Sequence, residues 1–222
     1  MISTIVPCFN AERYLAAALA SLLGQSLSTD EIIVVDDGST DSSVEIANAF
    51  GARIRVISQP NLGASAARNR GIAESQGSLI TFLDADDLKP TRAHEQLCHA
   101  LTADAALSVG VVEQFVSEEV GSDLAATIGV PPPQVGRLAG AFIVRRNVFD
   151  QIGLFDTTVA FGETMDWFSR FESAGLGIRW TTEAVLRRRL HAANSVHKRE
   201  RLKSEYLKVL RQDVARRRLV AP

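Results

Sequence analysis

Residues 32–41 read IIVVDDGSTD, and this stretch decides the fold. It begins with four β-branched apolar residues, which is typical of a strand buried on both faces of a parallel sheet. Asp37 is the second of two aspartates that follow this run, and Gly38 permits a tight turn after them. A carboxylate here can accept a hydrogen bond from a ring N–H or a ribose hydroxyl. The alternative is an Asx turn that caps the next helix, a task that Ser39 or Asp41 would also serve.

The same pattern extends outward over the first hundred residues, where strands and helices alternate. The predicted strands are residues 2–6, 32–35, 53–58 and 78–83. The predicted helices are residues 11–24 (capped by Asn10), 42–50, 64–75 and 91–102. Four strand–helix units in a row predict an α/β fold with a mostly parallel central sheet flanked by helices. Ligands of such sheets bind at the carboxyl ends of the strands.

Beyond residue 103 the elements become shorter and less regular. The predicted strands are residues 105–115, 140–144, 177–181 and 184–190, and the predicted helices are residues 147–152 and 163–174. We expect these strands to form a second, smaller sheet. Residues 198–218 carry leucines at helical spacing among many basic residues and predict a C-terminal helix.

Length and composition exclude several classes of protein. The chain has 222 residues, of which 46% are hydrophobic and 23% charged, so we treat residues 1–222 as a single globular domain. Cys8 and Cys98 are too few for a disulfide framework and match no zinc-ligand spacing. The sequence shows neither an apolar run of about 18 residues nor the basic start and apolar core of a signal peptide. We therefore expect a cytoplasmic protein.

Charge is distributed unevenly along the chain. Residues 1–178 hold 11 basic and 22 acidic residues, whereas residues 179–222 hold 13 basic and 4 acidic residues. The basic end lacks interleaved aromatic residues, so we expect no nucleic-acid partner. We favour a helix over 198–218 that packs on the acidic body or on a second subunit of a homodimer. The alternative is peripheral contact with the anionic inner face of a membrane.

Residues 79–87, LITFLDADD, place three more carboxylates directly after a buried strand. Asp84, Asp86 and Asp87 could hold Mg²⁺ or Mn²⁺ from one side and leave the other side for water and phosphate oxygens. A solvated turn that caps the next helix is one alternative. Another is the D-x-D-x-T/V loop of haloacid-dehalogenase-type phosphatases, which we rank lower because Leu88 stands where that loop has Thr or Val.

Residues 61–69, NLGASAARN, begin the third predicted helix with small residues and one cation. A helix start of this kind is a natural phosphate site, with Arg68 close to it. The alternative is a plain alanine-rich core helix with Arg68 on the surface.

Together these motifs resemble the inverting family 2 glycosyltransferases of the GT-A fold. The matching stretches of the first half are residues 5–10, 33–41, 61–71 and 83–87; those of the second half include Gly140, Arg145, Gly153, Glu163, Asp166 and Arg170. The resemblance covers residues 2–190, and five motifs in the correct order make it specific.

The resemblance implies a set of nucleotide-binding residues. They are Pro7, Phe9, Asp37, Asn61, Arg68, Asp84 and Asp86. The Pro7 segment and Asp37 would contact the base, Arg68 would lie near the base or the phosphates, and Asp84 would lie near the ribose. Asp86, with Asp87, would hold the metal on the diphosphate.

The resemblance also implies an activity. A Rossmann-like GT-A domain would bind the nucleotide sugar with residues 1–103 and the acceptor with residues 104–190, followed by the tail, residues 191–222. It would transfer a hexose, with inversion, from a nucleoside-diphosphate sugar to a hydroxyl of a saccharide, a lipid-linked sugar or another acceptor. We expect uridine as the base.

The catalytic base is where the sequence departs from the family. Relatives commonly have Glu-Asp where this chain has Glu163-Thr164, and that Asp is the usual base. Glu163 and Asp166 remain as candidates. Each also has a structural explanation: Glu163 could match the charge of a helix start, and Asp166 could pair with Arg170. If neither is the base, the chain is a nucleotide-sugar-binding pseudo-enzyme.

His191 follows three consecutive arginines, residues 187–189, at the end of the last predicted strand. Its imidazole could complete the metal shell or touch the diphosphate, with help from Arg189. The alternative is a surface loop before the basic helix.

Overall fold

The computed structural model describes residues 1–120, 130–159 and 162–191. The basic helix expected over residues 198–218 lies outside the described residues. Within the described residues, no helix is both long enough and apolar enough to cross a membrane.

Four parallel strands form the first half of the sheet. They are β1 (Ile2–Cys8), β2 (Glu31–Asp36), β3 (Arg55–Ser58) and β4 (Leu79–Phe82), in the spatial order β3-β2-β1-β4. The helices of this half are α1 (Leu15–Leu23), α2 (Ser43–Ala49), α3 (Ala64–Glu74) and α4 (Ala93–Ala100), with the 3₁₀ turn η1 (Gly51–Arg53) after α2. This arrangement confirms the α/β class and the mostly parallel central sheet. Strand order reverses at β1, which pairs with β2 on one side and β4 on the other. A ligand site is expected at this reversal.

The prediction that Asn10 caps the first helix is wrong. The helix begins at Leu15, and Asn10 lies before it with a left-handed φ of 49°. The Asn10 side chain instead accepts a hydrogen bond from the Thr40 N–H at 2.8 Å. It therefore ties the end of β1 to the turn after β2.

The second half extends the same sheet with shorter elements. Its strands are β5 (Leu107–Val116), β6 (Gln134–Val135), β7 (Phe142–Arg145) and β8 (Ile178–Leu190). Its helices are η2 (Ala139–Ala141), α6 (Asn147–Ile152) and α7 (Glu163–Ser173). Strand β7 is antiparallel to both β4 and β5, so it joins the two halves.

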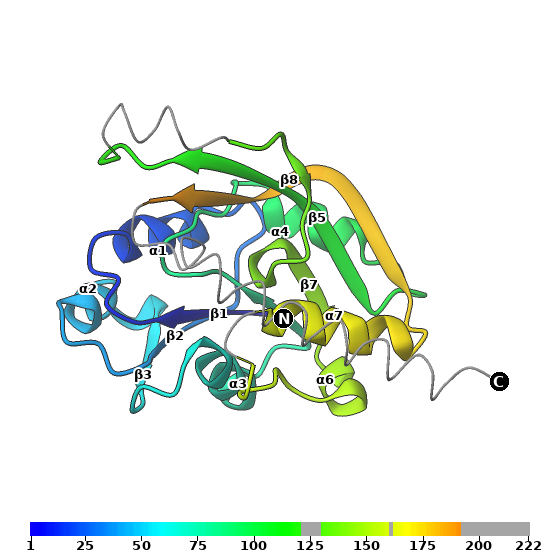
Figure 1. The fold of residues 1–222 in the computed structure, drawn as a ribbon, viewed down its shortest axis with the longest axis horizontal. Helices are drawn as coiled ribbons and strands as arrows, with labels where there is room; N and C mark the ends of the chain where they lie inside the picture. The colour runs from blue at the N-terminus through cyan, green and yellow to red at the C-terminus, as the bar shows by residue number, and fades with distance from the viewer. Residues whose placement is uncertain (121–129, 160–161, 192–222) are drawn as a thin grey trace.

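Two details of the second half differ from the sequence-based expectation. The strands expected in a separate, smaller sheet belong to one eight-stranded sheet, because β7 continues the ladder from β4 to β5. The two strands expected at residues 177–190 are one strand, β8, which runs parallel to β5 from Leu107↔Ile178 to Val116↔Leu190 (Figure 1). Shifts of register after Val109 accommodate the irregular stretch between them.

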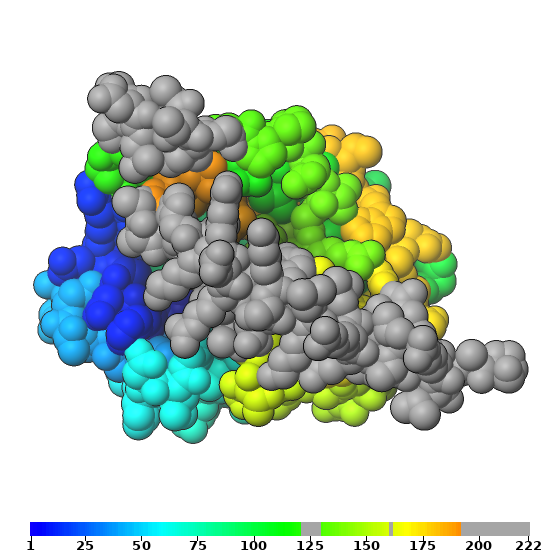
Figure 2. All heavy atoms as spheres, in the orientation of Figure 1, coloured from blue at the N-terminus to red at the C-terminus, as the bar shows by residue number. Residues whose placement is uncertain are grey.

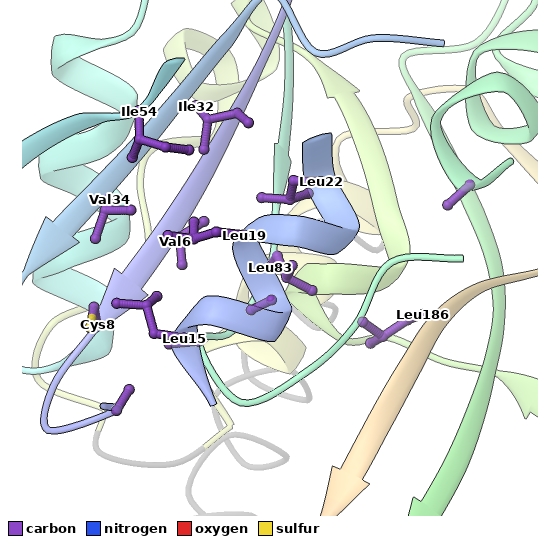
Figure 3. Close-up of a cluster of buried hydrophobic side chains, with 14 of the residues drawn as sticks. Val6, Cys8, Leu15, Leu19, Leu22, Ile32, Val34, Ile54, Leu83 and Leu186 are labelled. Carbon is purple, nitrogen blue, oxygen red and sulfur yellow. The ribbon is translucent and has the colours of Figure 1, made fainter. Parts of the chain in front are cut away.

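Helices cover both faces of the sheet (Figure 1). Side chains alternate along each strand, so Ile5 and Val6 point to opposite faces. Val6 belongs to a core with α1, α2 and α4, and Ile5 to a core with α3, α6 and α7. Figure 3 shows Leu15 and Leu19 of α1 beside Val6 in the first core. Burying each leucine contributes roughly 2 kcal/mol.

The two halves of the sequence lie side by side. In the space-filling view, the early segments (blue to cyan) lie at the left and the yellow segments lie toward the right, whereas green and orange segments extend along the top as far as the blue end (Figure 2). A backbone bridge also ties the loop after β4 to the last strand: Leu88 and Arg187 exchange hydrogen bonds of 3.0 and 2.9 Å.

Candidate functional site

A cavity of about 570 Å³ opens where the parallel strands end. Its walls come from the end of β1, the start of α3, the turn after β4, η2, the start of α7 and the end of β8. Of the residues predicted to be functional, Pro7, Phe9, Asp37, Arg68, Asp84, Asp86, Asp87, Glu163 and His191 line it. Asn61 and Asp166 are absent from that lining among the described residues.

Asp37 is buried and organises the loop before α3. Its Oδ1 accepts hydrogen bonds from Gln59 Nε2 at 2.7 Å and from the Leu62 N–H at 2.9 Å, and its Oδ2 accepts one from the Gly63 N–H at 2.8 Å. Two of these three donors are main-chain groups. The carboxylate is therefore held by the backbone.

Gly38 is required beside Asp37. It adopts a left-handed φ of 81°, and a Cβ atom there would lie 3.0 Å from the backbone nitrogen of Asn61. Asn61 thus approaches this turn through its main chain. Phe9, which follows the end of β1, is 50% exposed and also lines the cavity.

Arg68 is a buried bridge between the two halves. Its Nη2 donates to Asp84 Oδ1 at 2.7 Å, and its Nη1 donates to Glu163 Oε1 at 2.8 Å. Burial lowers the pKa of Arg68, but the two carboxylates outweigh burial and raise it above its ordinary value. Its buried Nε has no hydrogen-bond partner within the described part of the chain. Arg68 is therefore a buried cation paired with two carboxylates, and its Nε–H group is a hydrogen-bond donor without a partner in the described residues.

The three carboxylates of the turn after β4, residues 84–87 (the acidic turn), have different partners. Asp84 pairs with Arg68, and Asp86 Oδ2 lies 3.0 Å from His191 Nε2. Asp87 is buried and its Oδ1 accepts the Arg189 N–H at 2.8 Å. Burial raises the pKa of Asp87 well above its ordinary value, and the charges of Asp86 and Asp84 raise it further.

The donor chemistry of this turn suits a divalent cation only in part. Asp86 supplies a hard carboxylate oxygen on the cavity side and His191 an imidazole nitrogen beside it. Asp87 is committed to the backbone of β8. In the described residues, no group of three or more His, Cys, Asp or Glu side chains is arranged to hold a metal. Any remaining ligands would have to come from water or phosphate oxygens.

The two candidate bases lie in different environments. Glu163, at the start of α7, lines the cavity with 18% of its side chain exposed. Asp166 is 2% exposed, and its Oδ2 accepts from Arg170 Nε at 3.0 Å. The i, i+4 pair considered as the structural explanation for Asp166 is therefore present. Thr164 also lines the cavity, but it carries no carboxylate.

Sequence reasoning missed two polar residues of the cavity, Tyr14 and Arg188. Tyr14 precedes α1 and belongs to no motif, so no sequence signal marks it. Arg188 is the middle one of three consecutive arginines on β8. Arg188 lines the cavity, and its positive charge also acts on Asp87, whose pKa it lowers against the larger effect of burial.

An α/β sheet whose strand ends surround a cavity with an Asp-x-Asp turn has the architecture of the GT-A glycosyltransferases. The chain matches the family model of glycosyl transferase family 2 over residues 3–159. It belongs to that family, which confirms the family indicated by the sequence motifs.

Two of three similar relatives match only part of this chain. It is 47% identical to an uncharacterized glycosyltransferase of Haemophilus influenzae over 39% of this chain and 36% of that protein. It is 37% identical to the cholesterol galactosyltransferase of Borreliella burgdorferi over 46% of this chain and 30% of that protein. An uncharacterized glycosyltransferase of Rickettsia prowazekii is 27% identical over 96% of this chain and 73% of that protein. The matches thus span about a third of the first two relatives.

A solved structure supports the fold over the whole chain. The structure of Staphylococcus aureus TarS 1–349 in complex with UDP-GlcNAc superposes with a TM-score of 0.75 and 19% identity. The match covers 97% of this chain and 66% of the TarS chain. At this identity the likeness establishes the GT-A fold.

Proposed function

We propose that this chain transfers a sugar from a uridine-diphosphate sugar to an acceptor hydroxyl with inversion, and that Glu163 is the base. The observation that carries the proposal is the placement of Glu163 in the cavity, where buried Arg68 links it to Asp84 at the nucleotide side. The nucleotide sugar bound to TarS supports the choice of donor class.

Binding of the donor would use the ends of the parallel strands. The half-exposed Phe9 would offer an apolar ring to a base, and Asp37, which organises the loop before α3, lines the same cavity. Arg188, which lines the cavity, would offer its guanidinium to the phosphates, because Arg forms strong charge-assisted hydrogen bonds with them.

Transfer would be a single displacement. The acceptor oxygen forms a bond to the anomeric carbon while its proton moves to a Glu163 carboxylate oxygen. The bond from that carbon to the diphosphate oxygen breaks, and the electron pair leaves with the nucleoside diphosphate. Arg68 orients Glu163 for this step through its 2.8 Å hydrogen bond.

A divalent cation, Mg²⁺ or Mn²⁺, would be held by Asp86 with His191 beside it. When bound, it would neutralise charge that develops on the departing diphosphate.

The proposal is tested by measuring binding and transfer with the parent chain. Thermal shift with UDP and UDP-sugars, with and without Mn²⁺, should show stabilisation, since a ligand at 100 times its Kd adds about 2.7 kcal/mol. Release of UDP in the presence of an acceptor panel should follow. Binding without transfer across a broad panel would identify the pseudo-enzyme that the replacement at Thr164 allows. Absence of both would refute a nucleotide-sugar site.

A further inference from the structure

The end of β8 carries Arg189, which contacts the acidic turn, residues 84–87, and its surroundings. Arg189 Nε donates to the backbone oxygen of Asp86 at 2.9 Å, and Nη1 donates to Ser117 Oγ at 3.3 Å. Its guanidinium carbon lies over two rings, 5.0 Å from the centroid of Tyr14 and 4.8 Å from that of Phe115. Such stacking is attractive because the positive charge faces the negative ring face.

Tyr14 extends this cluster to His191. The two ring centroids lie 4.7 Å apart. The hydroxyl at the other end of Tyr14 donates to Glu119, which also accepts from Ser117 Oγ. Burial raises the pKa of Glu119, but these hydrogen bonds outweigh burial and lower it to about 2. Tyr14 is thus fixed at both ends.

We infer that Arg189 is a positioning residue: it fixes the backbone of Asp86 and, through Tyr14, the ring of His191 in the arrangement that metal-dependent nucleotide binding requires. This inference rests on the proposed function for its ligand, but its geometry belongs to the chain alone. Neither the family match nor the relatives assign a role to Arg189.

If Arg189 acts mainly through its charge, its loss should change metal binding in one direction; if it acts by positioning the turn, the change should be in the opposite direction. A guanidinium beside Asp86 and His191 repels a bound cation, so its removal would strengthen metal binding if charge were its main effect. If Arg189 mainly fixes the turn, its removal weakens metal-dependent binding. The sign of the change therefore separates the two roles.

Arg187 supplies a matched control. Its guanidinium carbon also lies 4.8 Å from the centroid of Phe115. In the described residues, however, the Arg187 side chain makes no hydrogen bond to the acidic turn, and it is exposed. Arg187→Met therefore removes a similar cation–π contact from the same strand without touching Asp86.

The first measurement is hydrogen exchange on the full ligand-free chain. The Asp87 N–H donates to Asp84 O, and the Leu88 N–H donates to Arg187 O, both at 3.0 Å. We expect these amides to exchange roughly tenfold faster in Arg189→Met, because the turn opens more often. Arg187→Met should exchange like the parent. Arg189→Lys keeps the charge but not the planar stack, so it should resemble Arg189→Met.

The second measurement is calorimetry with UDP and Mn²⁺. We expect Arg189→Met to bind roughly 10-fold more weakly, at the low end of the cost of losing an outer-shell partner. Arg187→Met should stay within about twofold of the parent.

Three results would overturn the inference: unchanged exchange in Arg189→Met, exchange in Arg189→Lys like that of the parent, or tighter Mn²⁺-dependent binding in Arg189→Met. If the parent itself binds no UDP, the proposed function fails instead, and the exchange experiment still decides the role of Arg189. If Arg189→Met does not fold, the exchange of Arg189→Lys decides it.

Discussion

Asp37 and Glu163 face one cavity from different halves of the chain, and different kinds of contact fix them there. Two backbone N–H groups and one side chain hold Asp37, which follows a buried strand directly. Glu163 begins a helix, and its one ion pair among the described residues is with the side chain of Arg68. Asp37 is thus fixed mainly by the backbone, and Glu163 by a side chain.

This difference has a consequence for substitution. A carboxylate held by the backbone keeps its surroundings when neighbouring side chains change, because main-chain donors cannot be substituted. A carboxylate held by one side chain depends on that residue. The position of Glu163 should therefore be more easily changed by substitution than that of Asp37.

The largest effect should come from Glu163→Gln. If Glu163 is the base, turnover should fall roughly 1,000-fold, within the 10²–10⁴ range of general base catalysis. UDP affinity should persist, because only the transition state needs the base. Steady-state kinetics and calorimetry measure the two.

Glu172→Gln on the same helix is the control for Glu163→Gln. It removes a carboxylate that pairs with Arg137 at 2.6 Å outside the cavity. Similar losses in both variants, or full turnover in Glu163→Gln, would remove Glu163 as the base.

Asp86→Asn tests the nucleotide half. We expect Mn²⁺-dependent UDP affinity to fall at least about 100-fold, the upper end for outer-shell partners, because Asp86 would bind the ion directly. Calorimetry with and without Mn²⁺ measures this loss. Asp150→Asn, an exposed aspartate on α6, should leave the affinity unchanged. Equal metal-dependent affinity in Asp86→Asn and the parent would exclude the metal site.

Arg68→Met breaks the link between the halves. It removes two hydrogen bonds to carboxylates from a buried position, which should lower the free energy of unfolding by about 2 kcal/mol. Urea denaturation measures this change. Arg70→Met, on the same helix but outside the cavity lining, loses a partly exposed pair with Glu74 and should cost less than about 1 kcal/mol. Equal costs would show that the bridge contributes no more than a surface pair.

The smallest effect concerns the stability of the nucleotide half at low pH. Burial, and then the charge of Lys89, lowers the pKa of His94 to about 3 from 6.5. The folded chain keeps His94 neutral while the unfolded chain protonates it, so stability is present above pH 6.5 and is lost as the pH falls. The parent should lose up to about 1 kcal/mol per pH unit more than His94→Gln between pH 6 and 4.

Chemical denaturation at several pH values measures this slope. His99→Gln changes an exposed histidine on the same helix and should keep the slope of the parent. Parallel slopes for the parent and His94→Gln would contradict the burial argument.

The first half of the chain could be predicted from the sequence because its signals are local. The apolar run at residues 32–35 and the aspartates after it define a strand and its end without any knowledge of distant residues. The bridge from Arg68 to Glu163 could not be predicted, because it joins residues 95 positions apart. Tyr14 could not be predicted for the same reason, because its contacts are with His191 and Arg189, which are distant in the sequence. Asp166 could not be separated from Glu163 by spacing, since only the packing of α7 decides which of them faces the cavity.

The bridge between Leu88 and Arg187 also has a consequence for synthesis. The two residues are 99 positions apart, so the contact between the loop after β4 and β8 can form only when β8 has been made. At about 5–20 residues per second, a nascent chain spends roughly 5–20 s with the four parallel strands synthesised and β8 still missing. Throughout that interval nucleotide cannot stabilise it through contacts with β8. The two cores beside the early strands are also incomplete in that interval, because one includes Leu186 and the other Trp167.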